Sequence, residues 1–157
     1  MSAAAAQATV PLYQEGKRFW QELFDECKRH VQAINSAVIA RGISLDSLVE
    51  FQPGSDIHMV KNGYPTTNVK ALLSFFAWGP VIQCTIAGAR DADHRLLTCE
   101  FEMPVARDLD GKTVAVFDEG RSFSPSEVAS YLTQAFRGCF RNISLPCGTR
   151  EASGQTA

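Results

Sequence analysis

Residues 69–116 read VKALLSFFAWGPVIQCTIAGARDADHRLLTCEFEMPVARDLDGKTVAV, and this stretch decides the fold because it can be arranged as one antiparallel meander. Three turn-like segments divide it: residues 77–80, residues 88–95, and Asp110-Gly111, which is a strong signal for a type I′ hairpin turn. Side chains alternate between the two faces of a strand. One face of the predicted meander is then entirely apolar, with Val69, Ala71, Leu73, Phe75, Ile82, Cys84, Ile86, Leu97, Cys99, Phe101 and Met103.

Each turn also predicts a register. A four-residue first loop sets Leu73 opposite Cys84, and a symmetric second loop sets Cys84 opposite Cys99. The Asp-Gly turn sets Val105 opposite Val116, and Arg107 opposite Val114, which continues the apolar face. A slip of one residue would move a whole strand's apolar set to the other face, and a bulge within the second loop would break its symmetry.

The opposite face, which we call the mixed face, alternates with the apolar one. Its predicted members are Lys70, Leu72, Ser74, Phe76, Val81, Gln83, Thr85, Thr98, Glu100, Glu102, Ala115 and Phe117. An apolar centre within a charged rim is typical of a protein interface. The sequence therefore predicts an interaction surface formed by Lys70, Leu72, Phe76, Val81, Gln83, Thr98, Glu100, Glu102 and Phe117.

The segments around the meander read as two helices and two more strands. Apolar residues recur at three- and four-residue steps between Thr9, a helix-capping residue, and Gly42, which predicts an amphipathic helix of about 30 residues, ~45 Å long. Ser124-Pro125-Ser126-Glu127 has the pattern of a capping box and predicts a second helix that ends near Arg141. Residues 47–52 and 56–61 predict two short strands whose facing stays open.

Together these segments predict one α+β domain spanning residues 1–157. A long N-terminal helix precedes an antiparallel meander of five to six strands, and a C-terminal helix follows, with both helices packed on the apolar face. Residues 1–8, which are rich in small residues, and residues 147–157, which are small and polar, are predicted to be flexible tails.

Composition limits the classes of partner. The formal net charge is −2 and no run of Lys or Arg occurs, so the chain lacks the basic footprint of proteins that bind nucleic acid or anionic membranes. No apolar stretch approaches the ~18 residues of a membrane span, and the first residues lack the pattern of a signal peptide. We therefore expect a cytoplasmic protein.

Five cysteines, an odd number without C-x-x-C spacing, argue against both a disulfide framework and a zinc site. They are predicted to be small core residues. The alternative is a cross-strand disulfide between Cys84 and Cys99, which the predicted register sets opposite one another.

No catalytic, cofactor or metal signature is present. Asp91, Asp93 and His94 cluster in one loop, and Asp108 with Asp110 has only the opening of a calcium loop, so both segments are predicted to be hairpin loops. Glu100 and Glu102 share a strand face and form either a solvated pair or an acid–base pair, of which the solvated pair is favoured. Nucleophile and phosphate-loop motifs are absent from the sequence.

Two function classes follow from these expectations. The first is a non-enzymatic module that self-associates, as a dimer, through the mixed face and needs no cofactor. The alternative is a small-molecule pocket, with or without catalysis, between the curved sheet and a helix. Partner binding through the long helix is a third route.

Overall fold

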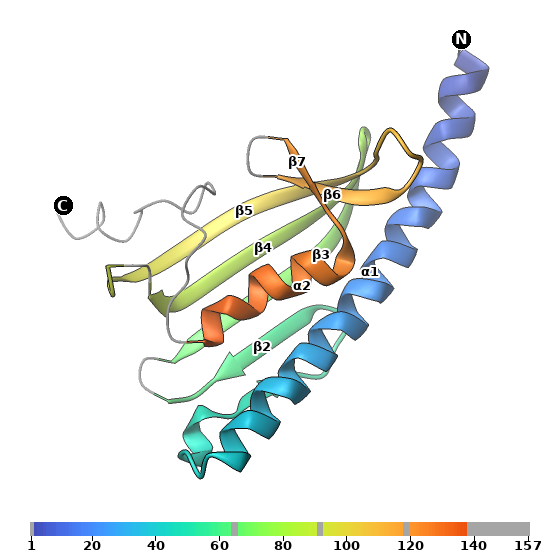
Figure 1. Cartoon of the computed structure of the whole chain (residues 1–157). Coiled ribbons are helices and arrows are strands. Elements are labelled where there is room, and N and C mark those ends of the chain that lie inside the picture. Colours follow the sequence, from blue (N-terminus) through green and yellow to red (C-terminus); the bar gives the residue numbers. More distant parts are fainter. Residues whose placement is uncertain (1, 64–65, 91–92, 118–119, 138–157) are drawn as a thin grey trace, which may run out of the picture.

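Seven antiparallel strands form one sheet in chain order, and two helices pack on one of its faces (Figure 1). The computed structural model describes residues 2–63, 66–90, 93–117 and 120–137, with side chains from Leu12 onward. The elements in chain order are α1 (Ser2–Ala40), η1 (Leu45–Ser47), β1 (Val49–Phe51), β2 (Ile57–Lys61), β3 (Thr67–Phe76), β4 (Gly79–Arg90), β5 (Leu96–Arg107), β6 (Thr113–Phe117), β7 (Arg121–Phe123), α2 (Pro125–Thr133) and η2 (Gln134–Phe136).

This architecture confirms the predicted α+β class, with one strand more than the expected maximum of six. α1 buries Phe19, Leu23, Cys27 and Val31, which recur every four residues, against the sheet. It begins at Ser2 and therefore has 39 residues, or ~58 Å, rather than the predicted 30 or so. Figure 1 shows its first turns projecting beyond the sheet.

The apolar face of the meander is the buried one, as predicted. Its central side chains are at most 7% exposed, and only Leu73 and Phe75, near the end of the β3–β4 hairpin, are more open. The predicted registers, however, are wrong. β3 and β4 are joined by the two-residue turn Ala77-Trp78, so Leu73 lies opposite Ile82 instead of Cys84. A shift of two residues preserves the face of every side chain.

A bulge at Gly88 changes the next pairing. β4 continues to Arg90, and its register shifts between Ala87 and Ala89. Gly88 has φ 80°, and a Cβ there would lie 2.0 Å from the Thr66 carbonyl oxygen, so only glycine fits. As a result Cys99 lies opposite Ile86, and the predicted pairing of the two cysteines is wrong.

The β5–β6 turn is not the predicted type I′ hairpin. The Asp108 carboxylate accepts hydrogen bonds from the backbone amides two and four residues later, at 2.9 and 2.8 Å. Gly111 takes φ 81° at the end of a three-residue loop. Val105 consequently lies opposite Ala115 rather than Val116, and this one-residue difference reverses the faces of β6.

The first hairpin, whose facing the sequence left open, pairs Phe51 with Met59, so both face the core. Its outer strand, β1, is met by α1: the Asn35 amide donates to the Val49 carbonyl (2.9 Å) and accepts from the Val49 N–H (2.8 Å). A side chain thus satisfies a strand edge that would otherwise be open to pairing.

α2 begins as its sequence predicts. The Ser124 hydroxyl accepts from the Glu127 N–H, and the Glu127 carboxylate accepts from the Ser124 N–H, which completes the capping box. The helix ends at Thr133 and continues as η2, and the Thr133 hydroxyl donates a hydrogen bond to the Ala129 carbonyl. The predicted continuation to Arg141 and the tail 147–157 lie outside the described residues.

Candidate interaction surface

Most of the predicted interaction residues lie together on the sheet face away from the helices. Leu72 is 43% exposed and Phe76 is 38% exposed. Around them Lys70, Glu100 and Glu102 are exposed, and Gln83 and Thr98 are half-buried. These side chains come from three adjacent strands, β3, β4 and β5.

Phe117 does not belong to this surface, and its assignment to the mixed face is wrong. It is 5% exposed and packs in the core between Phe101 and Phe123, whose ring it stacks on at 4.1 Å. Ala115 joins the core with it, while Val116 does not. The cause is the three-residue β5–β6 loop, which turns β6 over by one residue.

Val81 is also unavailable for contact, although it lies on the expected face. It is 1% exposed, between Ser74 and Pro104 of the neighbouring strands. The apolar centre of the mixed face is therefore carried by Leu72 and Phe76 on β3.

A hydrogen-bonded row crosses the mixed face. The Ser74 hydroxyl donates to the Gln83 carbonyl oxygen (2.9 Å), and the Gln83 amide donates to the Glu102 carboxylate (3.2 Å). The row joins β3, β4 and β5 and holds the Glu102 side chain in place. Glu100 and Glu102 are both exposed to solvent, which matches a wet sheet face better than the enclosed setting of an acid–base pair.

The end of the β3–β4 hairpin adds aromatic side chains that the sequence reading did not select. Trp78 is 73% exposed and stacks on Phe76, with ring centroids 4.8 Å apart. On the other side of the hairpin, Tyr13 of α1 stacks on Phe75 at 4.1 Å. We call Tyr13, Phe75, Phe76 and Trp78 the aromatic end. The side chain of a tryptophan in a tight hairpin turn projects beyond the sheet and stays exposed. The position of Trp78 beside Gly79 and Pro80, which are typical turn residues, is therefore the sequence signal that could have identified it.

Gly16 allows α1 to reach the aromatic end. A Cβ at this position would lie 2.7 Å from Pro80 Cγ, so a larger residue would push α1 away from the hairpin. The close approach sets Tyr13, one turn earlier, over the Phe75 ring.

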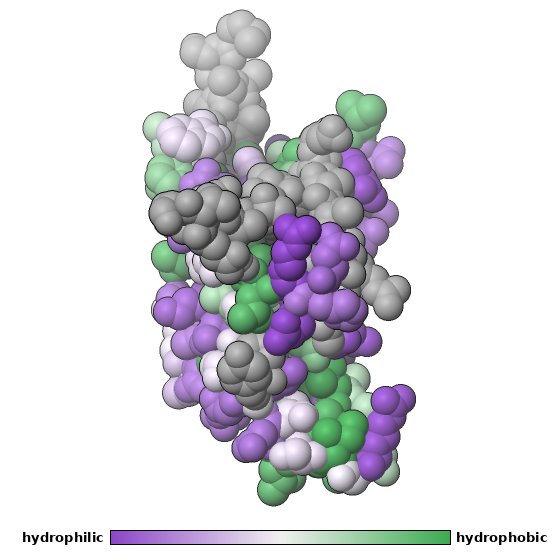
Figure 2. All heavy atoms as spheres, turned by 90° about the vertical axis from the view of Figure 1, so that its left-hand side faces the viewer, coloured by the Kyte–Doolittle hydropathy of each residue, from purple (hydrophilic) through white to green (hydrophobic). Residues whose placement is uncertain are grey.

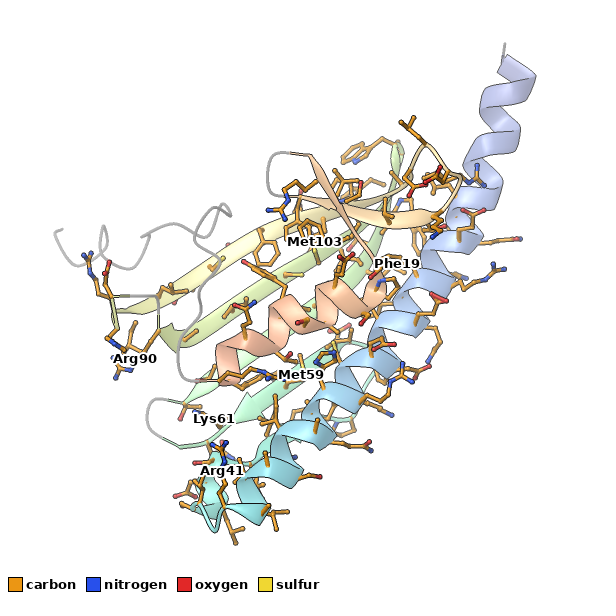
Figure 3. All side chains as sticks on the ribbon, viewed as in Figure 1. Phe19, Arg41, Met59, Lys61, Arg90 and Met103 are labelled. Carbon is orange, nitrogen blue, oxygen red and sulfur yellow. The ribbon has the colours of Figure 1, made fainter. Side chains whose placement is uncertain are left out.

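The space between the helices and the sheet is filled. Figure 3 shows Phe19 on α1 and Met59 and Met103 on the sheet pointing into this layer, and all three are at most 2% exposed. A ligand pocket in the middle of this layer would have to displace core side chains. An open groove of about 480 Å³ lies instead at one end of the layer, beside the last turns of α1.

Two of the cysteines are buried thiols. Burial raises the pKa of Cys27 to about 12 and raises that of Cys84 further, and a negative charge on Cys27 would oppose ionisation of Cys84 as well. Both are free, so Cys84 is not bonded to Cys99. Cys99 is disulfide-bonded, which corrects the expectation that the cysteines are all unpaired core residues.

Within the residues that the structure describes, no cluster of three or more His, Cys, Asp or Glu residues is arranged to hold a metal ion. None of the helices described combines the length and the apolar character that crossing a membrane requires. Of the predicted loop cluster, Asp91 lies outside the described residues, while Asp93 contacts Arg95 at 3.8 Å.

Comparison with known proteins gives no relative: no family model, curated protein or solved structure matches the chain. Fold alone does not determine function.

Proposed function

We propose that the chain is a non-enzymatic interaction module that forms a homodimer through the mixed face and the adjacent aromatic end. One observation carries the proposal: Leu72, Phe76 and Trp78 are large, apolar and substantially exposed, and they lie along β3 and the turn after it, on a sheet face that neither α1 nor α2 covers. Contiguous exposed apolar side chains beside a charged rim are characteristic of binding surfaces.

The charges on this face suit a second copy of the same chain. The strand registers set Lys70, Thr85 and Glu100 in one row across β3, β4 and β5. A two-fold axis along β4 would bring β3 of one copy over β5 of the other, and therefore Lys70 over Glu100 and Leu72 over Glu102, each twice. Such pairing of opposite charges favours this orientation over others.

The expected affinity is modest. Burying a large apolar side chain completely contributes ~1.5–3 kcal/mol, and the three centre residues are already partly covered. Association opposes this with a cost of at least ~4 kcal/mol. We therefore expect a dissociation constant of about micromolar, with ~800 Å² buried per copy.

Analytical ultracentrifugation across the micromolar range tests the proposal. The unmodified chain should shift from monomer to dimer with concentration, and Phe76→Glu should remain monomeric because it places a charge in the apolar centre. Leu109→Glu is the matched control: Leu109 is fully exposed in the β5–β6 loop, so it changes apolar surface and charge equally without touching the mixed face. A chain that is monomeric throughout, or a Phe76→Glu variant that dimerises normally, contradicts the proposal.

A charge exchange tests the orientation. Lys70→Glu should weaken the dimer, because two carboxylates would then face each other at each contact. Combining it with Glu100→Lys should restore dimerisation, since the exchanged pair is again complementary. Failure of the double variant with retention of the Phe76→Glu effect would reject the proposed axis.

A further inference from the structure

The open groove beside the C-terminal turns of α1 combines apolar walls with a border of cationic side chains. Apolar side chains of α1, of the segment after it and of η2 form its walls: Ile34, Val38, Ile43 and Phe136. Phe136 is 5% exposed and forms a buried part of the wall, whereas Ile43 is 42% exposed. Figure 2 shows hydrophobic residues gathered at this lower end of the molecule.

Three cations border the groove and come from three separate segments: Arg41 follows α1, Lys61 ends β2, and Arg137 follows η2. Figure 3 shows Arg41 and Lys61 near one another at the lower end of α1. Among the residues that the structure describes, no carboxylate lines the groove. In the described part of the chain, none of the three forms an ion pair.

This concentration of positive charge is notable in a chain whose net charge is −2. Like charges that converge without counter-charges repel one another, and an anion bound between them relieves that repulsion. The effect of Arg137 reaches the neighbouring His30, whose pKa is lowered by burial first and then by the positive charge of Arg137.

We propose that this groove binds a small amphiphilic anion, a carboxylate with an unbranched apolar tail. The carboxylate lies among Arg41, Lys61 and Arg137, where charge-assisted hydrogen bonds are available. The tail lies along Ile34 and Val38 toward Phe136. The volume of about 480 Å³ is within the ~300–1,000 Å³ of small-molecule sites and is too small for a folded partner.

Isothermal titration calorimetry with decanoate, below its critical micelle concentration, tests this directly. Two comparison probes separate the contributions: acetate carries the head without the tail, and decyltrimethylammonium carries the tail with the opposite charge. We expect saturable binding of decanoate, no measurable heat with acetate, and binding of the ammonium at least about tenfold weaker. Equal binding of the two long-chain probes would reduce the groove to a nonspecific apolar surface and overturn the proposal.

Substitutions localise the site. Arg41→Gln and Lys61→Gln should each weaken decanoate binding by about tenfold, the loss typical of one charge-assisted hydrogen bond. Ala37→Trp should block the tail, and because Ala37 is exposed on α1 the substitution leaves the core intact. Arg90→Gln is the matched control, since Arg90 lies on β4 away from the groove (Figure 3). No binding by the unmodified chain, or equal losses in Arg41→Gln and Arg90→Gln, would refute the assignment.

The groove and the proposed dimer surface lie toward opposite ends of α1, so the two proposals can be tested independently. Phe76→Glu should bind decanoate as the unmodified chain does, and Arg41→Gln should dimerise normally. A ligand-binding defect confined to the groove variants therefore supports the anion site whatever the oligomeric state.

Discussion

Glu15 connects the N-terminal half of α1 to the β5–β6 hairpin through three hydrogen bonds. Arg107 donates from one edge of its guanidinium, Nε at 2.9 Å and a terminal nitrogen at 2.7 Å, and the Thr113 hydroxyl donates at 2.8 Å. The bonds from Arg107 lower the pKa of Glu15 most, followed by the bond from Thr113, while burial acts against them. The positive charge of Arg18 on the same helix lowers it slightly further.

This cluster predicts an acid-sensitive contribution to stability. A carboxyl whose pKa is lower in the folded chain stabilises fully at a pH above its ordinary value of 4.5 and loses that contribution as the pH falls through the lowered value. Glu15→Gln should therefore unfold at lower urea than the unmodified chain at about pH 7, and the gap should narrow toward about pH 3.

Urea titrations followed by circular dichroism at both pH values measure the gap. Glu22→Gln, an exposed carboxyl on the same helix with no hydrogen bond of this kind among the described residues, is the control and should show little difference at either pH. If the difference in stability between Glu15→Gln and the unmodified chain stays constant with pH, the ionised form of Glu15 is not what stabilises the fold.

At the scale of elements, Asn35 is the contact that completes the sheet edge. Its amide both donates to and accepts from Val49, as a neighbouring strand would, and so satisfies the outward backbone groups of this first residue of β1. Both bonds are partly buried, so their loss leaves a donor and an acceptor without partners.

Asn35→Ala should lower the free energy of unfolding by about 1–3 kcal/mol, the cost of unsatisfied backbone groups at such a site. Asn35→Asp separates the two bonds, because its carboxylate can accept from the Val49 N–H but cannot donate to the carbonyl. We expect an intermediate loss for Asn35→Asp in urea titrations. Gln32→Ala, at an exposed position of α1, should be near neutral, and a loss there equal to that of Asn35→Ala would show that only helix propensity is being measured.

For the strands, the sequence could predict which face is buried but not the register between neighbours. Alternation predicted the buried face of β3, β4 and β5 because it depends on parity alone, and shifts of two residues leave parity unchanged. Register depends on turn length, which the two-residue turn before Gly79 and the bulge at Gly88 determine, and alternation does not reveal that these two glycines take positive φ angles.

The same limitation explains the errors in the candidate surface. Phe117 was assigned to the wrong face because the loop after Asp108 has one residue more than a type I′ turn, and one residue reverses parity. Trp78 was missed because it was assigned to a longer loop. The open groove at the end of α1 was missed because Arg41, Lys61 and Arg137, which border it, are far apart in the sequence and lie around one groove only in the folded chain.

At the scale of the whole molecule, α1 is the longest element and links chemically different regions. In its N-terminal half, Tyr13 forms part of the aromatic end, and its last turns border the open groove. Between them Leu23 and Cys27 are fully buried against the sheet. The proposed dimer surface and the open groove therefore depend on one common core. Unfolding of that core should abolish both dimerisation and anion binding, whereas a substitution in one surface should abolish only one of them.

The buried thiols offer a way to observe that event. Cys27 on α1 and Cys84 on β4 belong to one core cluster, so an alkylating reagent reaches them only when the helix leaves the sheet. Timed alkylation in native buffer, with each site resolved by peptide mass spectrometry, should modify both slowly and at one shared rate. Rapid modification of Cys84 alone would mean that β4 opens while α1 stays in place. The alkylation rate of these two thiols therefore measures, without denaturant, how often α1 detaches from the sheet.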